Sequence, residues 1–466
     1  MGAASAELGP GDAIRPSKWK ICARMKHIDD DTIFAIATGA GRAAIAILRL
    51  SGPATRGIVK SLAGKCPEPR VVARGIFSDP ASGEAIDSGL LIFFPGPKSF
   101  TGEDYAEIHV HGGRAVLTAL IAALGAMANT RPAEPGEFTR RGFVNGKMDL
   151  AEVEGLADLI DAETEWQRRQ ALRQTEGILG RQAAMWRAKL IEAAALLEAE
   201  IDFPEEEGIP ASVGRRVGEV LAPVLTALKA EIAAGRAAER LREGVVIVIA
   251  GPPNVGKSTL LNALARREVA IVSPFAGTTR DTLEVHLDLG GCPVTLIDTA
   301  GLRESSDAVE KMGVARALEK AQSADLILWL SEAGAPALPP ETRGATWPIS
   351  TKGDLVPASE RSADAEGLYI SAESGENLDL LVARLREFAG GIVSDGHAGL
   401  ITRERHRKAF ELAALALERV LGGLEGPVEL LAEDLRAAIF SLQRLTGEVG
   451  VEDVLDEIFS RFCIGK

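Results

Sequence analysis

The stretch GPPNVGKST at residues 251–259 has the residue types and the spacing of a phosphate-binding loop. It matches the pattern G-x-x-x-x-G-K-[ST], in which glycines let backbone N–H groups face phosphate oxygens. Lys257 is predicted to reach the β- and γ-phosphates of a nucleoside triphosphate, and Ser258 to bind Mg²⁺ through its hydroxyl. An apolar strand at 245–250 precedes the loop, and the helix that follows points its N-terminus at the anion. This stretch therefore predicts a site for a nucleoside triphosphate with magnesium.

Two further stretches predict contacts with magnesium and with the γ-phosphate. GTTRD at 277–281 supplies Thr279, whose hydroxyl can close over Mg²⁺ when a γ-phosphate is present. DTAG at 298–301 follows another apolar strand. Asp298 can hold magnesium there through a water molecule, and Gly301 can donate its N–H to the γ-phosphate.

The base of the nucleotide is predicted to be guanine. TKGD at 351–354 places Asp354 where a carboxylate can accept from the two N–H donors of guanine, which selects GTP over ATP. SAE at 371–373 is expected to complete the base pocket. The residues predicted to bind the nucleotide are Asn254, Val255, Gly256, Lys257, Ser258, Thr259, Ser273, Thr278, Thr279, Asp298, Thr299, Ala300, Gly301, Thr351, Lys352, Asp354, Ser371 and Ala372.

Two of these motifs depart from the usual GTPase pattern. Thr351 stands where Asn is usual, so one stabilising hydrogen bond is expected to be lost while Asp354 keeps the preference for guanine. Leu302 stands where many GTPases carry the Gln that orients water, so hydrolysis must recruit another group. The nearby acidic candidates are Glu304, Asp307 and Glu310.

A cation is also needed to stabilise the charge that develops during hydrolysis. Asn254 lies three residues before Lys257 and puts an amide oxygen beside the phosphates. Together with carbonyl and hydroxyl oxygens of 273–278, it could bind a monovalent cation that takes the place of an arginine finger.

The composition argues against several classes of protein. The chain has 466 residues and a net charge of -14, which argues against a broad surface for nucleic acid but leaves room for a local basic patch. No apolar run approaches the roughly 18 residues of a membrane span, and no apolar signal segment is found near the N-terminus. The four cysteines lack C-x-x-C spacing, which disfavours zinc or disulfides and predicts a cytoplasmic location.

The hydrophobic pattern predicts a multidomain α/β chain. Residues 1–28 are expected to be an extension, and short apolar strands with one helix at 29–148 indicate an α+β domain. Helical spacing dominates 149–243, whereas strands and helices alternate over 244–386, which is typical of a parallel sheet. Helical spacing returns at 387–466. We therefore expect a helical domain interrupted by an inserted, Ras-like P-loop domain.

The chain resembles the MnmE family, also called TrmE, of bacterial tRNA-modification GTPases. The likeness runs from about Asp31 to Lys466 and includes PKSFTGEDYAEIHVHGG, RPAEPGEFTRRGFVNGKMDLAEVEGLADLIDAET, DTAGLRESSDAVE and the terminal FCIGK. It implies an N-terminal folate-binding domain that drives homodimerisation, an all-α helical domain built from two segments, and an inserted G domain.

The resemblance also implies an activity. The family's K⁺-dependent GTPase forms a heterotetramer with an FAD-dependent MnmG-type partner. Together they add a carboxymethylaminomethyl or aminomethyl group to C5 of the wobble uridine, position 34, of certain tRNAs. The implied carbon donor is a tetrahydrofolate derivative of the 5,10-methylene or 5-formyl type, and no membrane is involved.

Residue roles carried over from the family are expectations of the same kind. Glu310 matches the glutamate that orients the attacking water. Ser258 and Thr279 match the magnesium ligands. The potassium positions are Asn254, Ser273, Phe275 (through its carbonyl) and Thr278. The folate positions are Arg49, Glu103, Lys147 and Lys466.

Cys463 lies in the terminal FCIGK, which the resemblance places beside the folate domain. Two roles stay open for it. A stabilised thiolate could act as a nucleophile toward a one-carbon donor, or the residue could serve positioning without covalent chemistry.

Two other functions compete with this one. A ribosome-assembly GTPase of the Era or Der type shares the GPPNVGKS and DTAG stretches but has no need for SFTGED or FCIGK. A stand-alone folate-dependent methyltransferase would not need the inserted G domain. The basic clusters at 140–147 and 403–408 are either solvated faces or contacts for tRNA.

Overall fold

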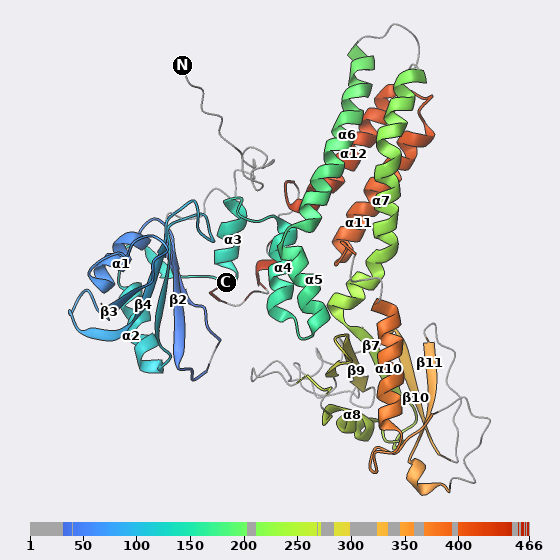
Figure 1. Cartoon of the computed structure of the whole chain (residues 1–466), viewed down its shortest axis with the longest axis horizontal. Helices are drawn as coiled ribbons and strands as arrows, with labels where there is room; N and C mark the ends of the chain where they lie inside the picture. Colours follow the sequence, from blue (N-terminus) through green and yellow to red (C-terminus); the bar gives the residue numbers. More distant parts are fainter. Residues whose placement is uncertain are drawn as a thin grey trace, which may run out of the picture. The chain divides into compact units, whose positions relative to one another are not determined.

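The computed structural model forms two compact units (Figure 1). One unit contains the residues up to Glu154 together with Gln443–Lys466, and the other contains Gly155–Leu442. The structure describes residues 31–39, 41–202, 211–267, 269–271, 284–298, 324–333, 345–357, 368–393, 399–449, 455, 458–460, 462 and 464–465.

The first unit is built on a six-stranded sheet with the strand order β3-β4-β5-β2-β1-β6. Neighbouring strands are antiparallel except β1 and β6, which are parallel. The strands are β1 (Thr32–Ile36), β2 (Ile45–Ser51), β3 (Ala73–Ser78), β4 (Ala85–Phe94), β5 (Tyr105–His111) and β6 (Thr130–Pro132).

The two faces of this sheet differ in character. Helices α1 (Thr55–Ala63) and α2 (Arg114–Gly125) pack on one face, where Leu48 and Leu50 of β2 join a buried cluster with apolar residues of both helices. Because side chains alternate along a strand, Arg49 lies on the opposite face. That face carries a smaller apolar cluster around Tyr105 and Phe138, the latter from α3 (Glu137–Val144).

The C-terminal tail packs on the first unit. Ile464 forms an antiparallel bridge with Pro135. Gly465 has a φ of 97°, and a Cβ there would lie 2.3 Å from the carbonyl oxygen of Ile36. The close approach and the positive φ both require glycine at this position. The terminal residues are therefore fitted against strand β1.

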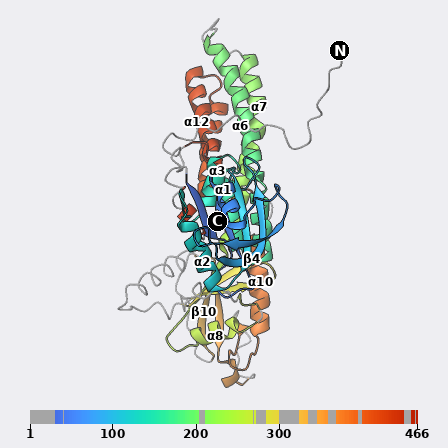
Figure 2. The ribbon, with the colours of Figure 1, turned by 90° about the vertical axis from the view of Figure 1, so that its left-hand side faces the viewer.

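The second unit contains long helices that run side by side, as α6, α7 and α12 show in Figure 1 and again in Figure 2. Helix α7 packs against both α6 and α11. Thr164 opens α5 with a capping box to Gln167, which satisfies donors that the first turn leaves free. The helices are α5 (Glu165–Thr175), α6 (Ile178–Asp202), α7 (Ala211–Glu243) and α11 (Glu404–Gly422). Helices α4 (Leu150–Asp161) and α12 (Val428–Thr446) each run across the limit between the units.

A second six-stranded sheet, with the order β12-β11-β10-β7-β9-β8, lies between α7 and α11 in the sequence. All its neighbours are parallel except β8 and β9. The strands are β7 (Val245–Ala250), β8 (Glu284–Asp288), β9 (Pro293–Asp298), β10 (Leu326–Glu332), β11 (Ala345–Thr351) and β12 (Leu368–Tyr369). Helices α8 (Lys257–Ala265) and α10 (Leu378–Val393) contribute to its core. The predicted multidomain α/β fold is confirmed.

The two chain segments that flank this inserted sheet lie close together. Arg242 at the end of α7 donates from Nε to the carbonyl of Thr402, just before α11, at 2.8 Å. Insertion of one domain into another requires such closeness. The predicted boundaries at residues 149, 244 and 387 stay predictions, and α10 runs across the last of them.

Candidate functional site

The phosphate-binding loop joins the carboxyl end of β7 to the N-terminus of α8. Gly251 has a φ of 146°, and a Cβ there would lie 2.4 Å from the carbonyl oxygen of Leu330, so only glycine fits. Gly256 caps α8 with a φ of 100°. The buried Lys257 donates from Nζ to the carbonyls of Gly251 and Pro252 at 3.0 and 2.8 Å. Its ammonium group is thus held over the loop that is predicted to bind phosphates.

The two oxygen donors predicted near magnesium meet in the structure. Ser258 Oγ donates to Asp298 Oδ2 at 2.6 Å, because β7 and β9 are neighbours and both residues lie at the same edge of the sheet. Mg²⁺ prefers hard oxygen ligands such as a hydroxyl and a carboxylate. This pair therefore has the ligand types that a magnesium ion takes, and Ser258 would bind the ion directly while Asp298 would hold it through water.

Thr351 ties the guanine motif to the phosphate-binding loop. Its buried hydroxyl lies 2.7 Å from the carbonyl oxygen of Val255 and 3.1 Å from that of Ser331. One hydroxyl hydrogen serves one acceptor at a time, and the shorter contact links the two motifs. Threonine lacks an amide, as noted from the sequence, but it holds the two loops together with its hydroxyl.

The two stretches of the predicted base pocket are also neighbours. Gly353 donates its N–H to the carbonyl of Ile370 at 3.0 Å, which brings TKGD next to SAE. Asp354 is exposed within a short 3-10 helix, Gly353–Leu355, while Ser371 is buried and accepts from the N–H of Ser374. The carboxylate is accessible to a base.

Several predicted residues lie outside the described part of the chain. They are Ser273, Phe275, Thr278, Thr279, Thr299, Ala300, Gly301, Glu310, Cys463 and Lys466. The predicted potassium site and the predicted water-orienting glutamate are therefore not described, apart from Asn254, whose φ is 61°.

A second polar site lies in the first unit, around the predicted folate position Glu103. The carboxylate of Glu103 accepts from Ser51 Oγ at 2.7 Å and from Arg141 Nη1 at 3.1 Å. Arg141 is fully buried and also pairs with the fully buried Glu137 at 3.0 Å. Burial alone would raise the pKa of Glu137, but hydrogen bonds from Arg131, the Glu134 N–H and Arg141 hold it at about 2.

Arg49, another predicted folate position, joins this site to the C-terminal tail. Its Nη1 donates to the carbonyl of Gly465 at 3.3 Å, directly before the predicted Lys466. Its Nε lies 3.3 Å from Glu107 Oε1. The predicted Lys147 donates to the carbonyl of Pro97 at 2.9 Å, in the loop that leads to Glu103.

Glu107 and its neighbours were missed from the sequence. Tyr105 donates its hydroxyl hydrogen to Glu107 Oε1 at 2.8 Å, and His109 Nε2 lies 3.6 Å from Glu107 Oε2. Burial and the Glu107 carboxylate raise the pKa of the Tyr105 phenol, against the opposing effect of Arg49. Alternation in DYAEIHVH places these residues on one face, but only the strand register pairs Glu107 with Arg49. We call Arg49, Ser51, Glu103, Glu107 and Arg141 the N-terminal polar site.

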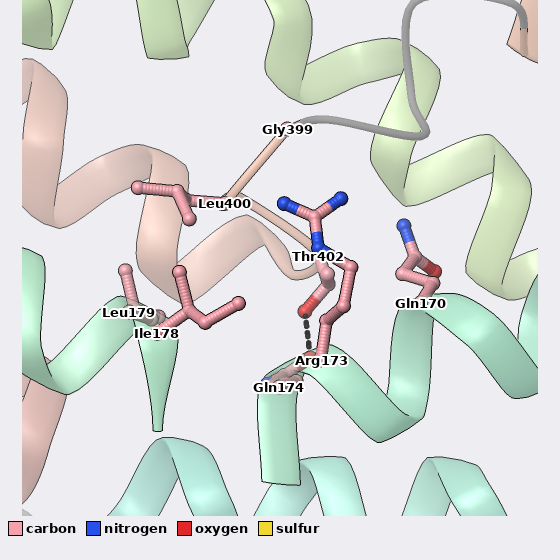
Figure 3. A pocket seen from close by; sticks show the side chains of 8 residues that line it. All are labelled: Gln170, Arg173, Gln174, Ile178, Leu179, Gly399, Leu400 and Thr402. Carbon is pink, nitrogen blue, oxygen red and sulfur yellow. Dashed lines mark hydrogen bonds between the residues drawn. The ribbon is translucent and has the colours of Figure 1, made fainter. Parts of the chain in front are cut away.

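A small cavity of the second unit lies between α5, the start of α6 and residues 399–402, which precede α11 (Figure 3). Its volume is about 20 Å³, and Gln170, Gln174 and Thr402 contribute polar atoms to its wall. Thr402 Oγ1 donates to Gln174 Oε1 at 2.9 Å, the dashed line in Figure 3. Such a volume holds one water molecule at most, so this cavity is not a cofactor site.

The described ranges contain neither a cluster of metal-binding side chains nor a helix suited to spanning a membrane. No group of three or more His, Cys, Asp or Glu side chains there could hold a metal ion. No helix among those residues is both long enough and apolar enough to cross a membrane.

Comparison with known proteins identifies the family. The model of the MnmE helical domain matches residues 150–463, and the model of the GTP-binding protein TrmE N-terminus matches residues 32–147. A relative from Beijerinckia indica subsp. indica, named tRNA modification GTPase MnmE, is 61% identical over 94% of this chain and 96% of its own length. The chain belongs to the MnmE family of tRNA modification GTPases.

Other members of the MnmE family agree with this assignment. A relative of the same name from Bradyrhizobium sp. (strain ORS 278) is 51% identical over 94% of this chain and its whole length. Among solved structures, Era from Aquifex aeolicus with GDP.AlF4- is 30% identical, covers 31% of this chain and 56% of its own, and has a TM-score of 0.24. The resemblance seen in the sequence is confirmed by the MnmE relatives, which span nearly the whole chain.

Proposed function

We propose that this chain hydrolyses GTP and couples hydrolysis to modification of C5 of the wobble uridine in certain tRNAs. The observation that carries the proposal is the presence of two built sites in one MnmE-family chain. One is the loop in which Lys257, Ser258 and Asp298 converge. The other is the N-terminal polar site, to which the C-terminal tail is tied through Gly465.

The nucleotide site is assigned to GTP with Mg²⁺ and K⁺. Ser258 and Thr279 would hold magnesium, and Asn254, Ser273, Phe275 and Thr278 would hold potassium. These cations would stabilise charge on the phosphates. Glu310 would orient the attacking water, since Leu302 cannot. Lys257 supports this assignment because it is already positioned over the phosphate-binding loop.

The N-terminal polar site is assigned to a tetrahydrofolate derivative, which would supply the one-carbon unit. Arg49, Lys147 and Lys466 offer positive charge for the glutamate carboxylates of folate, and Glu103 offers an acceptor for the pterin. The buried Arg141, itself paired with Glu137, would keep the Glu103 carboxylate in place. Cys463, two residues before Gly465 in the sequence, would act either as a nucleophile toward the one-carbon donor or in positioning.

A homodimer, an FAD-dependent MnmG-type partner and a cytoplasmic location belong to the same proposal. The sheet face opposite α1 and α2 supports dimerisation, because it exposes several large apolar side chains. Ile45, Ile76 and Leu90 are 61%, 63% and 44% exposed. Such surfaces commonly mark protein interfaces.

The test is mass spectrometry of nucleosides from total tRNA, with and without the gene. The proposal expects loss of the aminomethyl-type C5 modifications of the wobble uridine. Unchanged nucleosides together with a ribosome-assembly defect would overturn it in favour of a GTPase switch without modification chemistry.

A further inference from the structure

Several cations of the basic stretches 140–147 and 403–408 form ion pairs with carboxylates of the same chain. In 140–147, Arg141 is buried between carboxylates and Arg140 pairs with Glu134 at 3.3 Å. In 403–408, three cations lie beside carboxylates. The pairs are Arg403–Asp158 at 2.6 Å, Arg407–Glu239 at 3.2 Å and Lys408–Glu404 at 2.7 Å. These ion pairs reduce the positive charge that the two stretches present to a polyanion.

An arginine-lined groove of the inserted domain differs from these two stretches in how its positive charge is compensated. It lies between the C-terminal end of α8 and helix α10, has a volume of about 550 Å³, and is lined by Arg266, Arg267 and Arg386 with one acid, Asp379. Arg267 pairs with Asp379, whose side chain is otherwise almost fully exposed. Within the described part of the chain, Arg266 and Arg386 show no ion pair, so two positive charges face the groove uncompensated.

Arg386 of the groove lies near the turn between β8 and β9. Gly290, in the turn between β8 and β9, lies against its side chain, since a Cβ on that glycine would be 3.4 Å from Arg386 Cδ and Nε. The turn limits the space around the stem of the arginine, and among the described residues its guanidinium has no carboxylate partner. Arg266 directly follows the last turn of α8, where the helix dipole favours a cation, but no such effect accounts for Arg386 inside α10.

We propose that this arginine groove binds the phosphate backbone of tRNA. Arginine presents a planar fork of donors that matches phosphate oxygens, and an open groove suits a polymer better than a small enclosed ligand. The chain as a whole carries a charge of -14, so attraction of RNA depends on local positive sites such as this one. The inference rests on the proposed action on tRNA.

The groove leaves the nucleotide site free. The phosphate-binding loop lies at the N-terminal end of α8 and the groove at its C-terminal end, and a helix of nine residues is about 13 Å long. The two ligands, GTP and RNA, would therefore contact opposite ends of α8. Val269, which also lines the groove, accepts from the N–H of Asp288 at 2.7 Å and lies three residues before the stretch 272–283.

The experiment measures binding of labelled tRNA by the full chain as a function of KCl concentration, for the parent chain, Arg266→Ala, Arg386→Ala and the double variant. We expect weaker binding, with the slope of log K against log salt reduced by about 1 for each arginine removed. Arg386→Lys should retain the slope, because it retains the charge. Arg384→Ala is the matched control, being exposed on the same helix but outside the groove.

GTP hydrolysis by the variants, measured without tRNA, should equal that of the parent chain, which excludes unfolding as the cause. An unchanged salt slope in the double variant would overturn the arginine groove as an RNA site. Equal competition by polyglutamate and by tRNA would overturn it in favour of an acidic protein partner. The proposed function is judged separately by nucleoside analysis. If the chain modifies tRNA but the double variant has an unchanged salt slope, only the proposal for the groove is rejected.

Discussion

The nucleotide site and the N-terminal polar site place polar groups by opposite means. In the nucleotide site, nine consecutive residues at 251–259 supply the loop, and the strand order brings Asp298 to it. In the N-terminal polar site, Arg49 on β2 meets Gly465, which is 416 residues away in the sequence. The first site is a local backbone shape, and the second depends on sheet register and on the docking of a tail.

The two sites also differ in how their charge is compensated. Among the described residues, Lys257 of the nucleotide site donates to two backbone carbonyls of its loop and pairs with no carboxylate, so its charge is available for an anionic ligand. In the N-terminal polar site, Arg141 is balanced by Glu137 and Glu103 before any ligand arrives. We conclude that the nucleotide site is held ready for a phosphate, whereas the buried charges of the N-terminal site are part of its structure. The predictions below test this contrast.

The largest effect is expected from Glu137→Gln. The change leaves Arg141 buried with less compensation, and breaking a buried ion pair costs about 3–5 kcal/mol of unfolding free energy. The folded-state pKa of Glu137, about 2, lies below the value of 4.5 expected when unfolded. The contribution of ionised Glu137 to the free energy of unfolding is therefore fully present above pH 4.5 and is lost as pH falls toward 2.

Denaturant unfolding of the parent and the variant between pH 7 and pH 3 checks this prediction. The difference in unfolding free energy should shrink as pH falls through 4.5. Arg140→Gln is the control, because its guanidinium is partly exposed and its ion pairs should contribute little. A pH-independent difference would show that the charge of Glu137 is not what stabilises the unit.

Sequence patterns predicted much of the inserted domain, because its sites depend on consecutive residues. The glycines of the phosphate-binding loop carry backbone angles that only glycine adopts easily, so their spacing is visible in the sequence. The buried parallel strand Val245–Ala250 is likewise a continuous apolar run. A helix follows the loop as predicted, and it begins at Lys257, inside the loop pattern.

The N-terminal polar site was predicted only in part. Arg49, Glu103 and Lys147 came from the family resemblance, and Glu107 and the buried Arg141 were not recognised. An arginine on a helix is usually exposed, and nothing in the sequence of α3 indicates that Arg141 is surrounded by Glu103 and Glu137. Contacts of this kind depend on which strands are neighbours, and one hydrophobic pattern is compatible with several strand orders.

A smaller effect is expected from Gly465→Ala. The φ of 97° and the predicted clash with the Ile36 carbonyl should cost about 1–3 kcal/mol in docking of the tail. Binding of 5-formyltetrahydrofolate, measured by calorimetry, should weaken while GTP hydrolysis in the same preparation is unchanged. Gly83→Ala is the matched control, because it has a similar positive φ but no atom within 4 Å of the new Cβ. Equal loss of both activities would contradict a separate role for the tail.

The smallest effect is expected from Thr351→Ala, which removes the hydroxyl that links the guanine motif to the phosphate-binding loop. The carbonyl of Val255 loses a donor, and a net hydrogen bond contributes about 0.5–1.5 kcal/mol. We expect GDP affinity to fall by up to about tenfold, as measured by displacement of a fluorescent nucleotide. Thr351→Ser keeps the hydroxyl and should bind as the parent does. If serine and alanine variants lose affinity equally, the methyl packing of Thr351 holds the loops together rather than its hydroxyl.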